Sequence, residues 1–590
     1  MDNKNLNNLR HSCSHLLAAA VLDLYPKAKP TLGPHIENGF YYDFDFGGTK
    51  ISEEDLPKIE KKMKQIVKNW NKVVKLDESI EEIKKRYKDN PYKLELIQEF
   101  LKRKEKITLY KSGNFIDLCK GGHIKNPTKE LKYFKLLSIA GAYWRGSEKN
   151  PMLTRIYGTV FPTKKELNEY LENLELEKER DHRKLGKELD LFVFSDLVGA
   201  GLPMFTDKGA TIRRELERFI QDEEIKRGYK HVITPPLAKT ELYKTSGHYP
   251  YYKDTMYPIM TVDDDELILR PMTCPHHFMI YKSRPRSYKE LPLRIAELAS
   301  QFRYEKSGEL TGLMRVRMFC LADAHIIARV IQTETVIKEV LELIDYVAKT
   351  LGLIKGKDYR YRLSLGDRSD EKKYYKDDKA WENAENILRQ VLKSTNSPFF
   401  EVPGEAAFYG PKIDIQMKKV SGKEETAFTV QYDFVMPKRF NLTYINEKGK
   451  EEQPIVIHRS SIGAIERVMA FLIEKYNGNF PTWLAPIQVK ILPISSRHFY
   501  YAKKVFDKLR ENKIRVELDD RNATLPGKIR DAQVEKVNYM LIIGDKEMNN
   551  KTVKIRTRYG KEVGPLPVKN FIKDIKDEIK NKIIWKSDLN

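Results

Sequence analysis

Residues 299–319, ASQFRYEKSGELTGLMRVRMF, carry the strongest fold signal in this sequence. They predict a strand, a polar loop containing glycine and a returning strand. Arg303 and Glu305 stand two positions apart, as do Arg315 and Arg317, so each pair is expected on one face of its strand. Arginine in such a place can clamp a phosphate through paired hydrogen bonds, and the glutamate can accept from an adenine amino group. The alternative is a salt bridge between the two strands, which is common in sheets.

This stretch lies in the largest region of the chain, residues 189–486. Its further strand signals are the runs LILRPM, RMFCLADAHIIA, KIDIQM, TAFTVQYDF and QPIVIHR. Several of them alternate polar and apolar residues and are joined by short polar turns, which favours an antiparallel sheet. Long amphipathic helices are expected at residues 211–227 and 332–351.

Three potential metal ligands, Cys274, His325 and His458, stand at strand ends or turns of the same region. A zinc site with three protein ligands needs sulfur or imidazole donors on rigid elements and one position left open for substrate. The three residues meet the first condition, but their wide separation makes spacing alone a weak signal. The alternative is a buried thiol and two hydrogen-bonded histidines.

Three other regions differ in pattern. Residues 1–162 combine an apolar helix from Leu16 to Tyr25, a strand GFYYDFDF and a loop DLCKGGH. Residues 163–188 contain a charged segment without early glycine or proline, which predicts a bridging helix over 164–187. Residues 487–590 alternate short apolar strands with helices, which predicts a small α/β domain with a largely parallel sheet. The chain as a whole is therefore expected to be an α+β multidomain protein.

Composition excludes several classes of protein. The chain has 590 residues and four cysteines, too few and too scattered for a disulfide framework, so a reducing, cytoplasmic setting is expected. The longest apolar run, LLAAAVL, is too short for a membrane span and follows no basic leader. The formal net charge is +22, which suits a polyanionic partner. The alternative explanation is an AT-rich genome, which favours lysine codons.

Near the start of the chain, His11 and His15 are four residues apart and share one face of a helix. Asp117, Cys119 and His123 stand on a glycine-rich loop that lets the backbone approach a ligand. From the residues alone, two capping or surface histidines and a buried thiol are the favoured explanation of this pattern.

Longer motifs point to a known family. FRYE followed by MRVRMF resembles motif 2 of the class II aminoacyl-tRNA synthetases, and IGAIERVMAFLIE resembles their motif 3. The helix at 211–227 running into VITPPL, with Pro235, resembles the dimer-forming motif 1. RDHRKLGKELDLF, RPMTCPHH, EAAFYGPKIDI, TVQYDF and FPTWLAP are similar in order and spacing to the bacterial threonyl-tRNA synthetases. The resemblance covers essentially the whole chain.

The resemblance implies a class II catalytic domain at 189–486 that ligates L-threonine to tRNA(Thr) with ATP and Mg²⁺, in a homodimer. Cys274, His325 and His458 match the family's zinc ligands. Arg303 matches the arginine on the ATP α-phosphate, Arg467 the one on the γ-phosphate, and Glu305 the adenine contact; Arg315 stands on the same motif. The matching residues around threonine are Met272, Asp323, Tyr409, Lys412 and Gln431.

The resemblance also assigns the two terminal regions. HSCSH, GFYYDFDF and DLCKGGH resemble an editing domain, at 1–162, that hydrolyses seryl-tRNA without a metal. Its matching residues are His11, His15, Tyr42, Lys93, Asp117, Cys119 and His123. Residues 487–590 resemble an anticodon-binding domain, with matching contacts at Asn522, Arg530, Glu547 and Arg556. Edge hydrogen bonds and stacking on splayed bases suit these residue types, although each of them also fits an ordinary surface role.

Three departures from the family pattern stand out. The family usually has a small ubiquitin-like domain before the editing domain, whereas here HSCSH stands close to the start. Leu321 and Ala322 precede Asp323 where the family usually has polar residues, and His276 replaces a glycine. These changes leave open a non-catalytic paralogue that binds RNA. A synthetase for another amino acid is disfavoured, because the zinc triad and the HSCSH module do not occur together in the serine, proline or histidine enzymes.

Overall fold

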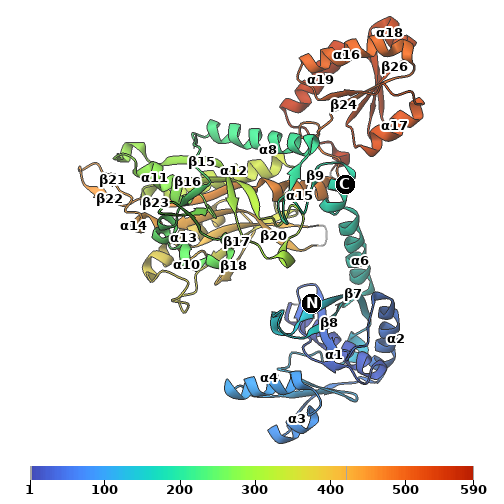
Figure 1. Ribbon diagram of the computed structural model, residues 1–590, viewed down its shortest axis with the longest axis vertical. Coiled ribbons are helices and arrows are strands. Elements are labelled where there is room, and N and C mark those ends of the chain that lie inside the picture. The colour runs from blue at the N-terminus through green and yellow to red at the C-terminus, as the bar shows by residue number, and fades with distance from the viewer. Residues whose placement is uncertain (1–2, 420–421, 589–590) are drawn as a thin grey trace. The chain divides into compact units, whose positions relative to one another are not determined.

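The computed structural model describes residues 3–419 and 422–588. It divides into two compact units, Met1–Glu175 and Leu176–Asn590, which are coloured from blue to red along the chain in Figure 1. Among the described residues, no helix is both long enough and apolar enough to cross a membrane.

The first unit is built on the long helix α1 (Asn3–Leu24), which packs against a five-stranded sheet. The strand order is β1 (Lys29–Pro30), β3 (Gly39–Asp45), β8 (Met152–Phe161) and β7 (Tyr133–Tyr143), with β2 (His35–Ile36) paired to β3. A smaller sheet contains β4 (Val73–Leu76), β5 (Leu109–Ser112) and β6 (Phe115–Leu118), near α3 (Ile80–Arg86) and α4 (Pro91–Lys102). Helix α2 (Leu56–Ile66) packs against α1 and β7. Helix α1 extends far enough towards the N-terminus to carry both His11 and His15.

The prediction of a single bridging helix over 164–187 is wrong. Two helices occupy this segment, α6 (Lys164–Glu179) and α7 (His182–Glu188). Asp181 is the N-cap of α7, and its carboxylate accepts a hydrogen bond from the backbone N–H of Arg183 at 2.7 Å. A side chain that satisfies the free amides of a helix start ends the preceding helix at the same place.

The second unit is organised around an eight-stranded sheet. Its order is β11 (Lys230–His231), β15 (Leu293–Phe302), β16 (Met318–Ala328), β23 (Ile455–Ala464), β20 (Glu424–Asp433), β19 (Lys412–Lys418), β17 (Tyr359–Leu365) and β18 (Phe399–Pro403). All pairings from β15 to β17 are antiparallel, as the alternating pattern predicted. The sheet packs against α12 (Thr333–Thr350), α13 (Asp378–Ser394) and α15 (Ile465–Tyr476), and α8 (Asp207–Lys226) packs on α15.

The prediction that the motif 2 residues lie on strand faces is wrong for all four of them: Arg303, Glu305, Arg315 and Arg317. Strand β15 ends at Phe302, which pairs with Met318 at the start of β16, so residues 303–317 form the connecting loop. Within it, the backbone N–H groups of Met314 and Arg315 both donate to the carbonyl of Thr311, at 2.9 and 3.2 Å. This tight turn forms the tip of the loop, where the sequence pattern suggested two strands paired by backbone hydrogen bonds.

The C-terminal part of the second unit has a five-stranded sheet in the order β25 (Val516–Leu518), β24 (Val489–Pro493), β26 (Tyr539–Ile543), β27 (Thr552–Thr557) and β28 (Glu562–Pro567). The first three strands are parallel, but β27 and β28 are antiparallel. The sheet is therefore mixed rather than largely parallel. Its helices are α16 (Phe499–Glu511), α17 (Leu525–Val534), α18 (Asp545–Asn550) and α19 (Val568–Lys580).

Candidate functional sites

Sheet register brings the predicted zinc ligands together. His325 on β16 lies directly opposite His458 on β23, and His458 lies opposite Gln431 on β20. Paired residues project to the same side of a sheet, so both imidazoles face one surface. Cys274, the first residue of α11 (Cys274–Lys282), completes the group, and one donor atom from each of the three lies within 4.8 Å of the others. All three residues are buried.

A chain of hydrogen bonds fixes the proton on His325. The Glu297 carboxylate can only accept, so His277 donates to it from Nε2 across 3.2 Å. A neutral His277 then has an unprotonated Nδ1, which lies 2.8 Å from Nδ1 of His325 and must accept from it. His325 is left with a lone pair on Nε2. Burial and the neighbouring histidines lower the pKa of His325 well below its usual value, so the ring is neutral, the form that binds metal.

Asp433 performs the same task for His458. Its Oδ2 lies 2.7 Å from His458 Nε2, and its Oδ1 accepts the backbone N–H groups of Val435 and Met436, both at 2.9 Å. Because the carboxylate is an acceptor only, Nε2 of His458 carries the proton and Nδ1 presents the lone pair. Carboxylate contacts of this kind orient histidine ligands in metal sites.

The charges around the three ligands fit a divalent cation. Burial raises the pKa of the Cys274 thiol well above its usual value, and the nearby carboxylates of Asp323 and Asp433 raise it further. Cys274 opens a helix, whose N-terminal amides favour a thiolate. A buried thiol beside two carboxylates and neutral imidazoles is the donor set that a zinc ion would neutralise.

The residues predicted to surround threonine lie next to the three ligands. The Tyr409 ring stacks on His458 with centroids 5.0 Å apart, and its hydroxyl donates to Gln431 Oε1 at 2.5 Å. Lys412 is the sheet partner of Gln431, and its Nζ lies 3.1 Å from Asp414. A Met272 carbonyl accepts from the Tyr243 hydroxyl at 3.2 Å. Asp323 lies 4.0 Å from His325 Nε2 and so borders the ligand lone pair.

Sequence reasoning missed several residues here, among them His248. This histidine is buried, packs edge-on against Phe408 with ring centroids 5.4 Å apart, and also approaches Tyr409. Burial lowers the pKa of His248 to about 3. His277, Glu297 and Asp433 were also missed. The sequence holds a weak signal for His277, which stands three residues after a predicted ligand, but none for the other two.

A cavity of about 270 Å³ is lined by the residues predicted to bind the nucleotide. Arg303, Glu305, Arg315 and Arg467 all line it. Burial, and then the charge of Arg467, lower the pKa of the Arg303 guanidinium. Arg315 also forms an ion pair with Glu305 at 2.9 Å; it lies within the loop and so is not the bridge between two strands that was the alternative. Several arginines that line one cavity favour a polyanion such as a triphosphate.

Two of the departures from the family pattern lie at these sites. Leu321 lines the nucleotide cavity, while Ala322 belongs to the core and is only 1% exposed. His276 is buried on α11, and its ring centroid lies 6.4 Å from that of Tyr243.

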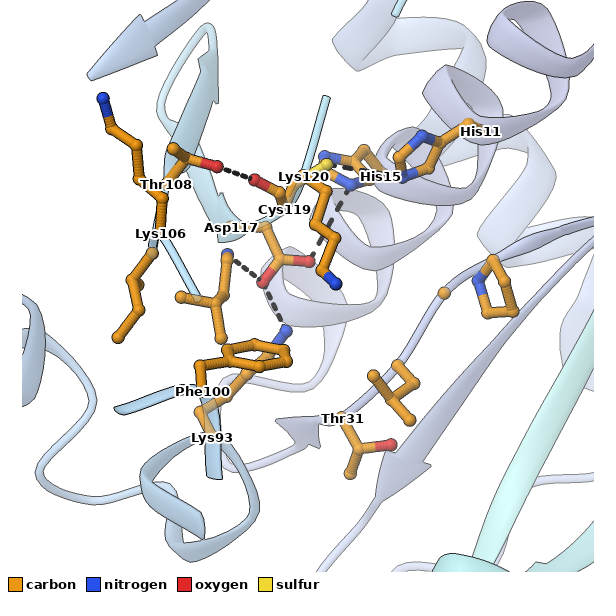
Figure 2. A pocket seen from close by; sticks show the side chains of 15 residues that line it. His11, His15, Thr31, Lys93, Phe100, Lys106, Thr108, Asp117, Cys119 and Lys120 are labelled. Atoms are coloured by element: carbon orange, nitrogen blue, oxygen red, sulfur yellow. Dashed lines mark hydrogen bonds and ion pairs between the residues drawn. The ribbon is translucent and has the colours of Figure 1, made fainter. Parts of the chain in front are cut away.

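The first unit contains a cavity of about 350 Å³ between α1, α4 and the loop after β6 (Figure 2). His11, His15, Lys93, Asp117 and Cys119 are among its lining residues. Lys106 and Lys120 also contribute to its wall, and Phe100 and Ile107 add apolar surface. The cavity therefore combines basic groups with a cluster of imidazoles and a thiol.

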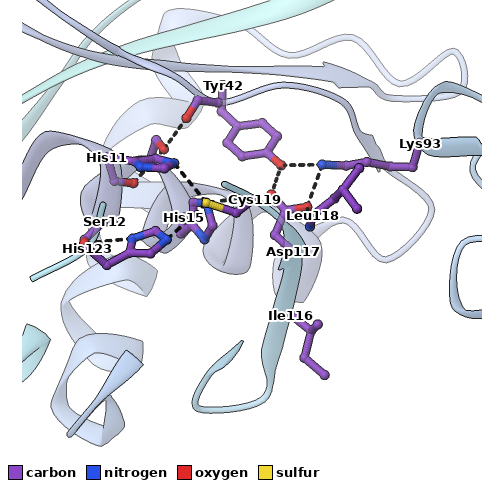
Figure 3. Close-up of polar contacts among 12 residues, drawn as sticks. His11, Ser12, His15, Tyr42, Lys93, Ile116, Asp117, Leu118, Cys119 and His123 are labelled. Atoms are coloured by element: carbon purple, nitrogen blue, oxygen red, sulfur yellow. Dashed lines mark hydrogen bonds and ion pairs between the residues drawn. The ribbon is translucent and has the colours of Figure 1, made fainter. Parts of the chain in front are cut away.

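The polar contacts of this cluster form two connected groups (Figure 3). Cys119 Sγ lies 3.5 Å from His11 Nε2 and 3.2 Å from His123 Nε2, and it accepts the backbone N–H of Gly121 at 3.2 Å. Beside it, Asp117 accepts from Lys93 at 2.5 Å and from the Tyr42 hydroxyl at 2.5 Å. The two histidines of α1 and the glycine-rich loop, which the family resemblance assigns to one site, therefore lie together in the structure.

Burial keeps the histidines and the thiol of this cluster uncharged. It lowers the pKa of His11, lowers that of His15 well below the usual value, and lowers that of His123 to about 3. The pKa of Cys119 rises to about 12, again chiefly through burial. Neutral imidazoles can accept protons from water, and a protonated thiol is a weak nucleophile. His11, His15, Cys119 and His123 also lie close enough together to hold a metal ion.

The four predicted anticodon residues are spread over the C-terminal part. Asn522 is exposed in a loop, and the Arg530 side chain is 81% exposed. Arg556 on β27 forms an ion pair with Glu562 at 3.0 Å. Glu547 is buried and accepts the backbone N–H of Gly544 at 3.0 Å, so it caps the start of α18.

Three family models match parts of the chain. Residues 257–476 match the tRNA synthetase class II core domain (G, H, P, S and T). Residues 488–578 match an anticodon binding domain, and residues 107–157 match the threonyl and alanyl tRNA synthetase second additional domain. These matches cover the eight-stranded sheet except for β11, the C-terminal sheet and the loop that carries Cys119.

Full-length relatives agree with the models. The threonine–tRNA ligase of Staphylococcus carnosus is 51% identical over 579 residues, which cover 98% of this chain and 89% of the relative. That of Geobacillus kaustophilus is 51% identical over 581 residues, 98% of this chain and 88% of the relative. A solved structure of the RNA binding domain of threonyl-tRNA synthetase from Cryptosporidium parvum Iowa II has a TM-score of 0.64 at 36% identity, covering 67% of this chain and 98% of that one. A prolyl-tRNA synthetase from the same species, 15% identical with a TM-score of 0.52, covers 68% of this chain and 77% of its own and shares the fold.

Proposed function

The chain belongs to the threonyl-tRNA synthetase family of class II aminoacyl-tRNA synthetases, and from this premise we propose how its residues divide the work. It ligates L-threonine to tRNA(Thr) with ATP through threonyl-adenylate, and it edits seryl-tRNA. The observation that carries the residue assignments is the convergence of Cys274, His325 and His458 on one face of the sheet that also bears the nucleotide cavity.

Amino-acid selection rests on the three ligands. When bound, zinc would supply an open position for the amino and hydroxyl groups of threonine. Glu297, acting through His277, and Asp433 hold the two imidazoles in the tautomers that leave their ligand lone pairs free. A pocket that only measures size separates valine from threonine by about 10²-fold, whereas a site that requires the hydroxyl rejects its absence by roughly 10⁴–10⁵. Tyr409 and Gln431, joined by a hydrogen bond, form the side of the threonine pocket next to His458.

Activation of threonine is the attack of its carboxylate on the α-phosphorus of ATP, with pyrophosphate leaving. The chain contributes position and charge rather than a covalent nucleophile. Arg303 is assigned to the α-phosphate and Arg467 to the γ-phosphate, and Mg²⁺ accompanies the nucleotide. Glu305 is assigned to the adenine amino group and is held by its ion pair with Arg315.

Serine retains the hydroxyl and is smaller than threonine, so the same selection admits it. Hydrolysis of seryl-tRNA is assigned to the cavity of the first unit. A neutral imidazole of His11, His15 or His123 can take a proton from the attacking water, and Lys93 and the Tyr42 hydroxyl fix Asp117 beside them. The proposal needs no metal here.

A homodimer in the cytoplasm is also part of the proposal. Helix α8, the element that resembles motif 1, bears Ile225, which is 55% exposed, and the segment after it bears Ile233, which is 97% exposed. Apolar side chains left in water beside this element suit a partner copy. All four cysteines are free thiols, a state that the reducing cytoplasm maintains.

Pyrophosphate exchange into ATP tests the proposed function. The purified protein is expected to catalyse threonine-dependent exchange and to contain one zinc per chain. Cys274→Ser should reduce zinc content and exchange together, while the exposed-surface change Lys184→Ala should reduce neither. Full exchange by a Cys274→Ser protein without zinc would contradict the ligand assignment, and no exchange by the unmodified protein would contradict the charging role of the catalytic region.

A further inference from the structure

His182 lies outside both proposed sites, yet it contacts the wall of the nucleotide cavity. It is the first residue of α7 and is 2% exposed. Its Nδ1 lies 2.7 Å from Oε1 of Glu474 on α15, and the backbone N–H of Leu313 donates to its Nε2 at 3.1 Å. One imidazole therefore joins three segments: α7, the helix α15 that carries Arg467, and the loop between β15 and β16.

These contacts determine the tautomer of His182. The Leu313 N–H is a donor, so Nε2 must be unprotonated. The single proton of the neutral ring is then on Nδ1, where it donates to the Glu474 carboxylate. Asp181, His182 and Glu474 also form a possible metal cluster. A metal on Nδ1 would force the proton to Nε2, directly against the Leu313 N–H, so the hydrogen bonds explain this cluster better than a metal does.

The loop residues next to this contact are built around the ring. Gly312 has a φ of +47°, and a Cβ added there would lie 2.2 Å from His182 Nε2 and 2.7 Å from Arg183 Cγ. No larger residue fits without moving the imidazole. The positive φ favours glycine for a second reason. Gly312 thus allows the loop backbone to rest on the histidine.

The two residues that follow line the nucleotide cavity. Leu313 and Met314 are both buried and both belong to its wall. The Met314 carbonyl accepts from Arg467 Nε at 3.3 Å, and Arg467 Nη1 donates to the Thr426 carbonyl at 3.0 Å. The segment that His182 holds therefore also holds the arginine assigned to the γ-phosphate.

We propose that His182 is a positioning residue for ATP: by accepting from Leu313 and donating to Glu474 it fixes the loop tip against α15, so that the Leu313–Met314 wall and Arg467 are in place before the nucleotide binds. This inference rests on the proposed assignment of the cavity to ATP. It predicts an effect on ATP binding and none on threonine binding, because the threonine residues are on β16, β19 and β20 and in the segments just before α11 and β19, outside this loop.

Two amide substitutions separate the contacts of the ring. In His182→Gln the side-chain oxygen reaches the position of Nε2 and can still accept from Leu313. In His182→Asn the amide reaches only the position of Nδ1, so the contact with Glu474 survives and the Leu313 N–H loses its acceptor. Orphaning a buried N–H is expected to raise the KM for ATP in the exchange assay about 10-fold, equivalent to ~1.4 kcal/mol. The KM for threonine should change less than about twofold in both variants, and His182→Gln should keep a KM for ATP near that of the unmodified protein.

Glu474→Ala provides an independent route to the same state. Without the carboxylate, the ring proton can move to Nε2 and oppose the Leu313 N–H, so this variant should behave as His182→Asn does. Lys184→Ala, on the exposed side of α7, is the matched control and should leave both KM values unchanged.

The outcomes separate the inference from the proposed function. Equal KM values for ATP in His182→Asn and His182→Gln would overturn the positioning role. So would a lower kcat and lower melting temperature with both KM values unchanged, because that is the result of a merely structural contact. Where His182→Asn does not fold, the comparison of Glu474→Ala with Lys184→Ala decides. Absence of threonine-dependent exchange in the unmodified protein would instead refute the proposed function, whatever the variants do.

Discussion

Replacing Asp433 by asparagine tests whether a residue that binds no substrate controls the metal site. Three donors point at its carboxylate: His458 Nε2–H at Oδ2, and the N–H groups of Val435 and Met436 at Oδ1. The carboxylate satisfies all three because both oxygens are acceptors. An asparagine has one acceptor oxygen and one NH₂ group, so it cannot satisfy all of them in either orientation.

The asparagine oxygen is expected to face the two backbone donors, because that orientation keeps two hydrogen bonds and loses one. Its NH₂ group then faces His458 Nε2 and favours the tautomer with the proton on Nδ1, the nitrogen that would bind zinc. Metal binding must move this proton back to Nε2, against the NH₂ group. Loss of such a carboxylate–histidine contact typically weakens metal binding about 10–100-fold, or ~1.4–2.8 kcal/mol, in line with the 1–3 kcal/mol cost of an unsatisfied buried donor.

The measurement is the dissociation constant for zinc by competition with a chromophoric chelator, with threonine-dependent exchange recorded on the same samples. Asp345→Asn is the matched control, because Asp345 accepts from two tyrosine hydroxyls, those of Tyr359 and Tyr361, and has no contact with the ligands. It should bind zinc as the unmodified protein does. An Asp433→Asn protein with unaltered zinc affinity and a normal melting temperature would refute the tautomer argument.

Three further predictions concern the first unit. Cys119→Ala should leave charging of tRNA with threonine intact while seryl-tRNA accumulates; a normal rate of seryl-tRNA clearance would show that Cys119 has no part in editing. Lys93→Met should lower the free energy of unfolding by about 3–5 kcal/mol in urea titrations, because it leaves the Asp117 carboxylate buried without its ion pair; a loss below about 1 kcal/mol would contradict this. Because the folded-state pKa values of His15 and His123 lie below the unfolded value near 6.5, stability is fully present above pH 6.5 and is lost as pH falls towards about 3. The calorimetric transition of this unit should therefore shift to lower temperature between pH 7 and pH 4.5, and an unchanged or higher transition temperature would exclude that linkage.

Regular strands and helices were predictable, because their signals are local. Alternating residues predicted β16 and β23 as strands, but they did not predict that the two strands pair or in which register. The observed pairing is what brings His325 opposite His458. The i, i+4 spacing likewise placed His11 and His15 on one face of α1. Family motifs supplied the roles that these positions could not declare alone.

Features that depend on tertiary contact were not predictable in the same way. The residues around Arg303 were expected on strand faces, but the turn at Thr311 makes the segment a loop. That turn is held by His182, which is 131 residues away in sequence from its partner Leu313. Glu297 and Asp433 determine ligand protonation, yet in sequence they are ordinary acidic residues of strands. The break at Asp181 had a local signal, since aspartate before a helix start is a common N-cap.

The two His/Cys clusters of this chain differ in how their carboxylates are used, and on this difference we base the proposal of zinc at one and metal-free hydrolysis at the other. At the catalytic sheet, Asp433 accepts a hydrogen bond from His458, and His277, itself bonded to Glu297, accepts one from His325. Among the described residues, no lysine or arginine forms an ion pair with Asp323 or Asp433. Negative charge is left there for a cation to balance. In the first unit, Lys93 already balances Asp117 across 2.5 Å. A cation beside His15 and Cys119 would have to bind near that buried ammonium, at a cost in Coulomb energy. The same residue types therefore favour zinc at the catalytic sheet and neutral, proton-accepting imidazoles in the cavity of the first unit.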